Sequence, residues 1–339
     1  MARRRQRGLG GRLAVAAMGA LAALALVAAS ATVAGAAPET SAVPAAPGSS
    51  AAARTCPPTI DDREPASAAD RGLLWRISSD GRSSYLFATL HVGRPAWRAF
   101  GPSLTAAQAQ TDTLALEIDP ADPALAASLG ADPAGAAGPT LTPVLRDRLA
   151  RAVERACLPP AALASLDPVL QAVTLTMLEA RWLGLDASYA MEWLLAARAR
   201  AEGREVVALE SAAAQRSALV PAEPGAAQAM VEQALAQIED QTGRRVLARL
   251  AGAWERGDLA MLASYESWCE CAASEEDRAF LKRLNDDRNP HLADAIAELH
   301  RGGRRVFAAV GALHMTGPQA LPALLEARGF RVERIPFAP

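Results

Sequence analysis

Four polar side chains that can bind metals or move protons directly follow apolar runs in this sequence. SSYLFATL is followed by His91, TLAL by Glu117, VVAL by Glu210 and FAAVGAL by His314. Short apolar runs of this kind are typical of strands buried on both faces. Ligand sites of open α/β sheets lie at the carboxyl ends of the strands. If the four strands are parallel neighbours, these four side chains converge.

Two imidazoles and two carboxylates form a donor set that suits Mn, Co, Zn or Fe(II). A metal held by three of them leaves a position for water, and the fourth group can act as a general base. Each residue also has a plain structural interpretation, as a solvated loop residue or a hydrogen-bonded histidine. The chain has only four histidines, and the other two, His291 and His300, are expected to be solvated on a surface helix. ATLH and GALH each carry a small residue three positions before the histidine, which allows close backbone approach.

The elements that must position these residues can be read from the apolar pattern. GLLWRISSDGRSSYLFATLH predicts a β-hairpin around Asp-Gly, and TLALEID, REVVALES, RRVFAAVG and FRVERIPF predict further strands. Strands that alternate with helices predict an α/β (α+β) domain with a mixed, largely parallel β-sheet flanked by helices. A large helical insertion is expected at about 140–285, with one break around 269–274 in its second half. The net charge of −2 gives no indication of nucleic-acid binding.

The beginning of the chain has the pattern of an export signal. MARRRQRGLGGR is a positive segment, an apolar run follows, and Ala34-Gly35-Ala36 offers a cleavage site, so residues 1–36 are interpreted as a signal peptide. The alternative is an uncleaved membrane anchor, which would be the only source of membrane association. Residues 37–71 are interpreted as a flexible linker rich in Ala, Pro and Ser, and residues 72–338 as the folded domain. We expect export to the bacterial periplasm.

The cysteines fit that compartment. The chain has four, at positions 56, 157, 269 and 271, and an even number in an oxidising compartment favours disulfide bonds over a zinc site. A bond within Cys269-Glu270-Cys271 would close a very tight ring. We therefore expect Cys269 and Cys271 each to pair elsewhere, and the pairing itself stays open.

At these residues the sequence resembles the TraB/PrgY/GumN family, which includes the Tiki metalloproteases. The pieces that correspond to the family pattern are SSYLFATLH, LALEID, GREVVALES, DDRNPHLADAI and VGALHMTG, in that order across about residues 72–337. The resemblance implies a metal-dependent peptidase-like fold with His91, His314 and at least one of Glu117 and Glu210 at the site.

The resemblance also implies supporting roles for an Arg-Asn pair. Arg288 would act as a catalytic or substrate-binding group on a carboxylate or oxyanion, and Asn289 would bind substrate or only cap its helix. The sequence departs from the family at Ala88, where the family usually has Gly. If that position requires a positive φ, Ala would cost about 1 kcal/mol or more.

These observations predict an exported metal-dependent hydrolase, a peptidase that uses a divalent ion (Mn, Co or Zn) to activate water. Its partner would be a peptide or protein substrate. The first alternative is a non-catalytic envelope protein of the same fold that binds a metal, haem or a partner. The second is a disulfide-stapled structural protein in which the His and Glu residues are incidental.

Overall fold

The computed structural model describes residues 55–63, 67–122, 125 and 140–337. The segment interpreted as a signal peptide lies outside the described residues. Within the described part of the chain, no helix is long and apolar enough to cross a membrane.

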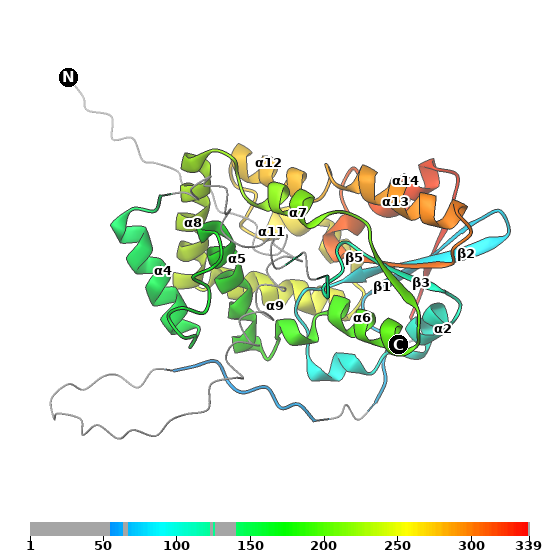
Figure 1. Cartoon of the computed structure of the whole chain (residues 1–339), viewed down its shortest axis with the longest axis horizontal. Coiled ribbons are helices and arrows are strands. Elements are labelled where there is room, and N and C mark those ends of the chain that lie inside the picture. Colours follow the sequence, from blue (N-terminus) through cyan, green and yellow to red (C-terminus); the bar gives the residue numbers. More distant parts are fainter. Residues whose placement is uncertain (1–54, 64–66, 123–124, 126–139, 338–339) are drawn as a thin grey trace.

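A six-stranded sheet forms the centre of the fold (Figure 1). Its strands are β1 (Leu73–Ser79), β2 (Arg82–Thr89), β3 (Thr113–Leu116), β4 (Glu205–Ala208), β5 (Val306–Gly311) and β6 (Arg331–Ile335), in the order β4-β3-β5-β2-β1-β6. Strands β2, β5, β3 and β4 are parallel neighbours, whereas β1 is antiparallel to both β2 and β6. The predicted α/β class with a mixed, largely parallel sheet is confirmed.

The hairpin β1–β2 follows from its turn residues. Ser79 pairs with Arg82, which leaves a two-residue loop of Asp80 and Gly81, both with positive φ. This conformation matches the twist of paired strands and is favoured by Asp-Gly. The predicted hairpin is therefore present where the sequence placed it.

Helices surround the sheet and extend beyond it. They are α2 (Pro102–Ala109), α4 (Pro143–Arg155), α5 (Pro168–Leu178), α6 (Met191–Ala201), α7 (Ala212–Leu219), α8 (Pro224–Glu239), α9 (Thr242–Glu255), α10 (Leu259–Ala263), α11 (Tyr265–Trp268), α12 (Glu275–Leu284), α13 (Asn289–Arg301) and α14 (Leu321–Ala327). Helix α6 packs on β3 and β4, and α13 packs on β5 and α14. The other helices of the middle region gather beyond the carboxyl ends of the parallel strands (Figure 1). The second half of this region has several breaks rather than the single one expected from its pattern.

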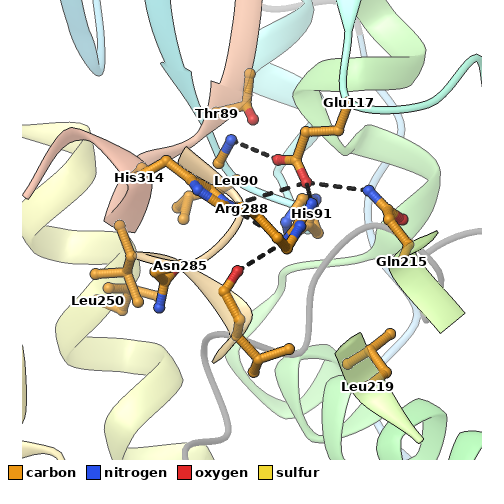
Figure 2. Close-up of a pocket in the computed structure, with 14 residues that line it drawn as sticks. Thr89, Leu90, His91, Glu117, Gln215, Leu219, Leu250, Asn285, Arg288 and His314 are labelled. Carbon is orange, nitrogen blue, oxygen red and sulfur yellow. Dashed lines mark hydrogen bonds and ion pairs between the residues drawn. The ribbon is translucent and has the colours of Figure 1, made fainter. Parts of the chain in front are cut away.

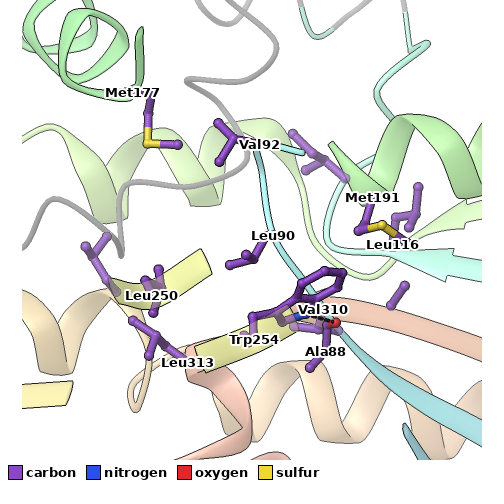
Figure 3. Close-up of a cluster of buried hydrophobic side chains, with 14 of the residues drawn as sticks. Ala88, Leu90, Val92, Leu116, Met177, Met191, Leu250, Trp254, Val310 and Leu313 are labelled. Carbon is purple, nitrogen blue, oxygen red and sulfur yellow. Dashed lines mark hydrogen bonds between the residues drawn. The ribbon is translucent and has the colours of Figure 1, made fainter. Parts of the chain in front are cut away.

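The apolar core is continuous from the sheet into the helical region (Figure 3). All six residues of β5 are buried, as expected for a central strand. Trp254 of α9 is fully buried and donates a hydrogen bond from its indole nitrogen to the carbonyl oxygen of Ala88, at 2.7 Å. Helix α9 thereby fixes the end of β2, the strand that leads to His91.

The four cysteines form two disulfides, Cys56–Cys157 and Cys269–Cys271. The expectation that Cys269 and Cys271 pair elsewhere is wrong. Glu270 between them has a positive φ of 55°, a conformation that brings the two flanking side chains together and that few non-glycine residues adopt. The expectation that His300 is solvated is also wrong. His300 is fully buried, and its Nδ1 forms a hydrogen bond with Ser84 Oγ at 2.8 Å. His291 is exposed, as expected.

Candidate active site at the carboxyl edge of the sheet

The structure brings together the four residues predicted from the strand ends. His91, Glu117 and His314 follow β2, β3 and β5, which are adjacent in the sheet, and Glu210 follows β4 at its edge. Glu117, Glu210 and His314 are buried, and the His91 side chain is only 12% exposed. Several of them, with residues of α7, α9 and α12, line a small cavity of about 30 Å³ (Figure 2).

Gly311, the last residue of β5, makes the convergence possible. A Cβ atom at this position would lie 3.2 Å from Glu117 Oε1, 3.4 Å from His91 Nε2 and 3.6 Å from His314 Cδ2. The missing side chain leaves a small space, the Gly311 cradle, which these three side chains border. The Gly311 N–H also donates to Glu117 Oε1 at 2.8 Å. Gly311, three positions before His314, therefore allows the close approach that the sequence predicts for a small residue here.

His314 is oriented by Asn289. The amide nitrogen of Asn289 donates to the carbonyl oxygens of His314 and Gln319. Its oxygen therefore faces His314 Nδ1, at 2.5 Å, so Nδ1 carries the proton and Nε2 is an acceptor. Burial lowers the pKa of His314 to about 3, which keeps the ring neutral at neutral pH. The predicted helix-capping role of Asn289 is wrong, because its side chain makes no capping bond to α13.

His91 is oriented by a carboxylate that the sequence analysis missed. Nδ1 of His91 lies 3.1 Å from Glu192 Oε1, an ion-pair distance, although the two groups are not aligned as a hydrogen bond. Burial lowers the pKa of His91, but the contact with Glu192 and the charges of Glu192 and Glu117 together outweigh it, so the net pKa is raised. The only signal for Glu192 in the sequence is a lone carboxylate within the apolar run of MEWLL.

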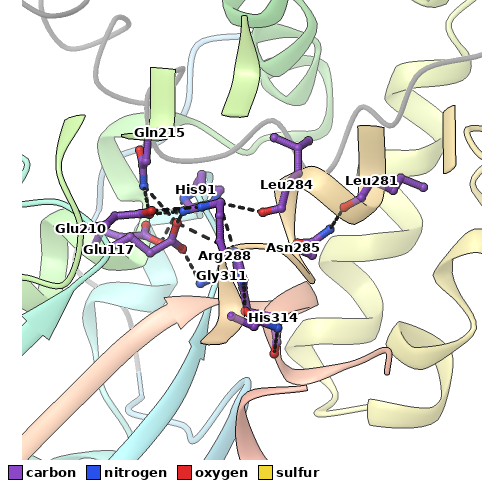
Figure 4. A network of polar contacts seen from close by, with 12 residues as sticks. His91, Glu117, Glu210, Gln215, Leu281, Leu284, Asn285, Arg288, Gly311 and His314 are labelled. Atoms are coloured by element: carbon purple, nitrogen blue, oxygen red, sulfur yellow. Dashed lines mark hydrogen bonds and ion pairs between the residues drawn. The ribbon is translucent and has the colours of Figure 1, made fainter. Parts of the chain in front are cut away.

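Arg288 links the two predicted glutamates (Figure 4). It donates to Glu117 Oε2 at 2.5 Å, to both oxygens of Glu210, and to the carbonyl oxygen of Leu284. Gln215 of α7 also donates to Glu117, at 3.1 Å, and to Glu210, at 2.9 Å. Burial raises the pKa of Glu117, but the Arg288 guanidinium, both histidines and the Gly311 N–H lower it well below its usual range. Glu117 is therefore ionised at neutral pH.

The donor set has the chemistry of a divalent metal site. Each histidine has its Nδ1 next to an oxygen that orients the ring, as is usual for metal-binding histidines. Nε2 of His91 borders the Gly311 cradle, and Nε2 of His314 lies 4.0 Å from Glu117 Oε2 and accepts a hydrogen bond from Arg288 at 3.3 Å. The carboxylates, however, are occupied by Arg288 and Gln215. Among the residues that the structure describes, no three His, Cys, Asp or Glu are grouped closely enough to hold one ion. The residue types fit a metal, and a bound ion would have to share Glu117 and His314 Nε2 with Arg288.

Ala88 occupies a regular position in β2, where the sequence departs from the family pattern. It pairs with Val310 and Leu73 and is fully buried, and it is not among the described residues with a positive φ. The methyl group therefore causes no backbone strain at this position.

Comparison with known proteins identifies one matching family. The model of the TraB/PrgY/gumN family matches residues 73–334, which span all six predicted site residues. No curated protein and no solved structure gave a match. Since the family model covers most of the folded chain, the chain belongs to the TraB/PrgY/gumN family.

Proposed function

We propose that this protein is an exported, metal-dependent hydrolase that acts on peptide bonds. The observation that carries the proposal is the Gly311 cradle, which brings together His91, Glu117 and His314 from three adjacent strands. Membership of the TraB/PrgY/gumN family supports it. Pairing of all four cysteines supports an oxidising compartment such as the periplasm.

In this proposal His91 Nε2, His314 Nε2 and Glu117 hold the divalent ion, which is Mn, Co or Zn. The ion would supply Lewis-acid polarisation of the substrate carbonyl and a lowered pKa for water. Glu192 and Asn289 hold the two imidazole rings in place, through the contacts at Nδ1.

Glu210 is the proposed general base. Its carboxylate is buried beside Glu117, and both accept a hydrogen bond from Gln215. In this role it would take the proton of an attacking water and pass it to the leaving amine. Arg288 stabilises the paired charges of Glu117 and Glu210 and supplies a fixed cation for a substrate carboxylate or oxyanion. Asn289 is fully buried and acts in this proposal on His314 rather than on substrate.

A second function is favoured by one observation, the closed network in which Arg288 and Gln215 saturate the two carboxylates. A cation of the protein itself already offsets part of the negative charge of the two carboxylates. A non-catalytic envelope protein of the same fold, in which Arg288 takes the place of a metal, would keep this network permanently.

The first test is the metal content and metal affinity of the purified, exported chain. We expect one tightly bound divalent ion in the wild type and none in His91→Ala/His314→Ala, because both imidazole ligands are removed. His291→Ala removes an exposed histidine of α13 and serves as the matched control. A metal-bound wild type that cleaves peptides supports the hydrolase. A folded wild type that takes up neither Mn, Co nor Zn would contradict it and favour the non-catalytic protein.

A further inference from the structure

Thr89, the last residue of β2, carries a buried hydroxyl group that has no partner. The residue is fully buried, and its Oγ1 makes no hydrogen bond within the described structure. Buried hydroxyls are usually paired, because an unpaired one loses its bonds to water without replacing them. The unpaired hydroxyl of Thr89 therefore needs a physical reason.

The position of Thr89 in the sheet supplies one. Thr89 pairs with Gly311 in the parallel register of β2 and β5, and residues paired in this way face the same side of a sheet. The Thr89 side chain therefore lies on the same side as the Gly311 cradle. It also lines the small cavity together with His91, Glu117 and His314 (Figure 2).

The size of the cavity indicates what the hydroxyl would bind. A volume of about 30 Å³ is enough for one or two water molecules, and a buried water needs about two to four polar partners. Thr89 Oγ1 can accept one hydrogen bond and donate another. The other polar groups on this cavity wall include the three candidate ligands His91, Glu117 and His314.

We propose that Thr89 is a catalytic residue whose hydroxyl binds and orients the attacking water. This inference rests on the proposed hydrolase. It assigns Thr89 a contact with the reacting atom, whereas Glu192 and Asn289 only position the histidines. The hydroxyl is kept at this buried place because its partner, the water, comes from solvent.

The isosteric change Thr89→Val tests this inference. It removes the hydroxyl and keeps the shape, so kcat on a cleaved peptide should fall at least tenfold with little change in KM. Thr89→Ser restores the hydroxyl and should recover most of kcat. Because Oγ1 has no protein partner, the Tm of Thr89→Val should equal or exceed that of the wild type.

Thr174 provides a matched control. It lies on α5, is fully buried, also has a hydroxyl without a hydrogen-bond partner, and does not line the cavity. Thr174→Val should keep both kcat and Tm. Wild-type kcat in Thr89→Val would overturn the inference while leaving the hydrolase intact. A clear loss of Tm in Thr89→Val also overturns it, with or without activity, because it would show that the hydroxyl has a structural partner. A wild type that cleaves no peptide is instead a failure of the proposed function, and the inference then fails with it.

Discussion

At the scale of single residues, the space at Gly311 is the feature on which the site depends. Gly311 has a φ of −51°, which alanine also adopts without strain. The variant Gly311→Ala therefore tests the space around the Cβ position and not the backbone conformation. The added Cβ would crowd Glu117 and His91. We expect a loss of about 1–3 kcal/mol in the free energy of unfolding, measured in urea, together with loss of the proposed metal binding.

Gly225→Ala is the control, because a Cβ there meets nothing within 4 Å. That variant should be neutral or slightly more stable. If Gly311→Ala binds metal as tightly as the wild type, the proposed ligands do not meet at the Gly311 cradle.

The sequence was informative about single residues where a polar group ends an apolar run. His91, Glu117, Glu210 and His314 stand out because a buried strand tolerates few polar neighbours. The guanidinium of Arg288 between two carboxylates could not be predicted, because that contact depends on how α12 and α13 meet the sheet. Burial of His300 was missed for the same reason: its partner Ser84 is distant in sequence and lies on β2.

At the scale of elements, helix α9 supports the strand that leads to His91. Trp254→Phe removes the indole donor to the buried carbonyl of Ala88, and we expect the free energy of unfolding to fall by about 1–3 kcal/mol. Thermal or urea unfolding measures this loss. The proposed peptidase activity should fall as well, since the end of β2 would no longer be fixed.

Trp268→Phe is the matched control for this change. Its indole donates to the carbonyl of Met261 in a partly exposed place, where water can replace the lost bond. An equal loss of stability in both variants would argue that ring volume, and not the bond to Ala88, explains the effect.

Strands were predicted more reliably than helix boundaries. An apolar run such as VFAAVG can only be buried, and Asp-Gly fixes the turn of the hairpin. The helices from α8 to α12 have short connections, and their apolar spacing continues across the breaks, so the pattern suggested longer elements. The strand order could not be predicted, because pairing between distant strands leaves no local pattern in the sequence.

At the scale of the whole molecule, the disulfide Cys56–Cys157 ties the start of the described chain to the end of α4. It closes a loop with a sequence separation of 101 residues. Loss of such a constraint costs about 2–5 kcal/mol, chiefly through the entropy of the unfolded chain. Cys56→Ala/Cys157→Ala should therefore be clearly less stable in urea than the wild type.

The stability effect of the second disulfide, Cys269–Cys271, can be compared with that of the first. Cys269 and Cys271 are only two residues apart, so their bond restricts the unfolded chain far less. Cys269→Ala/Cys271→Ala should lose less stability than the first pair. The reverse order would mean that the small ring is needed to hold the connection between α11 and α12.

The strand order has a consequence for how this protein is made. Strand β5 lies between β2 and β3 but follows both by some two hundred positions in the chain. Until it is synthesised, the hairpin and the β3–β4 pair have no strand between them and expose unpaired edges. Closure of the sheet must therefore wait for nearly the whole chain, and contacts over such a separation form slowly. If the chain is exported as we propose, it would reach the far side of the membrane with its sheet still open, and the candidate site would assemble only late in folding.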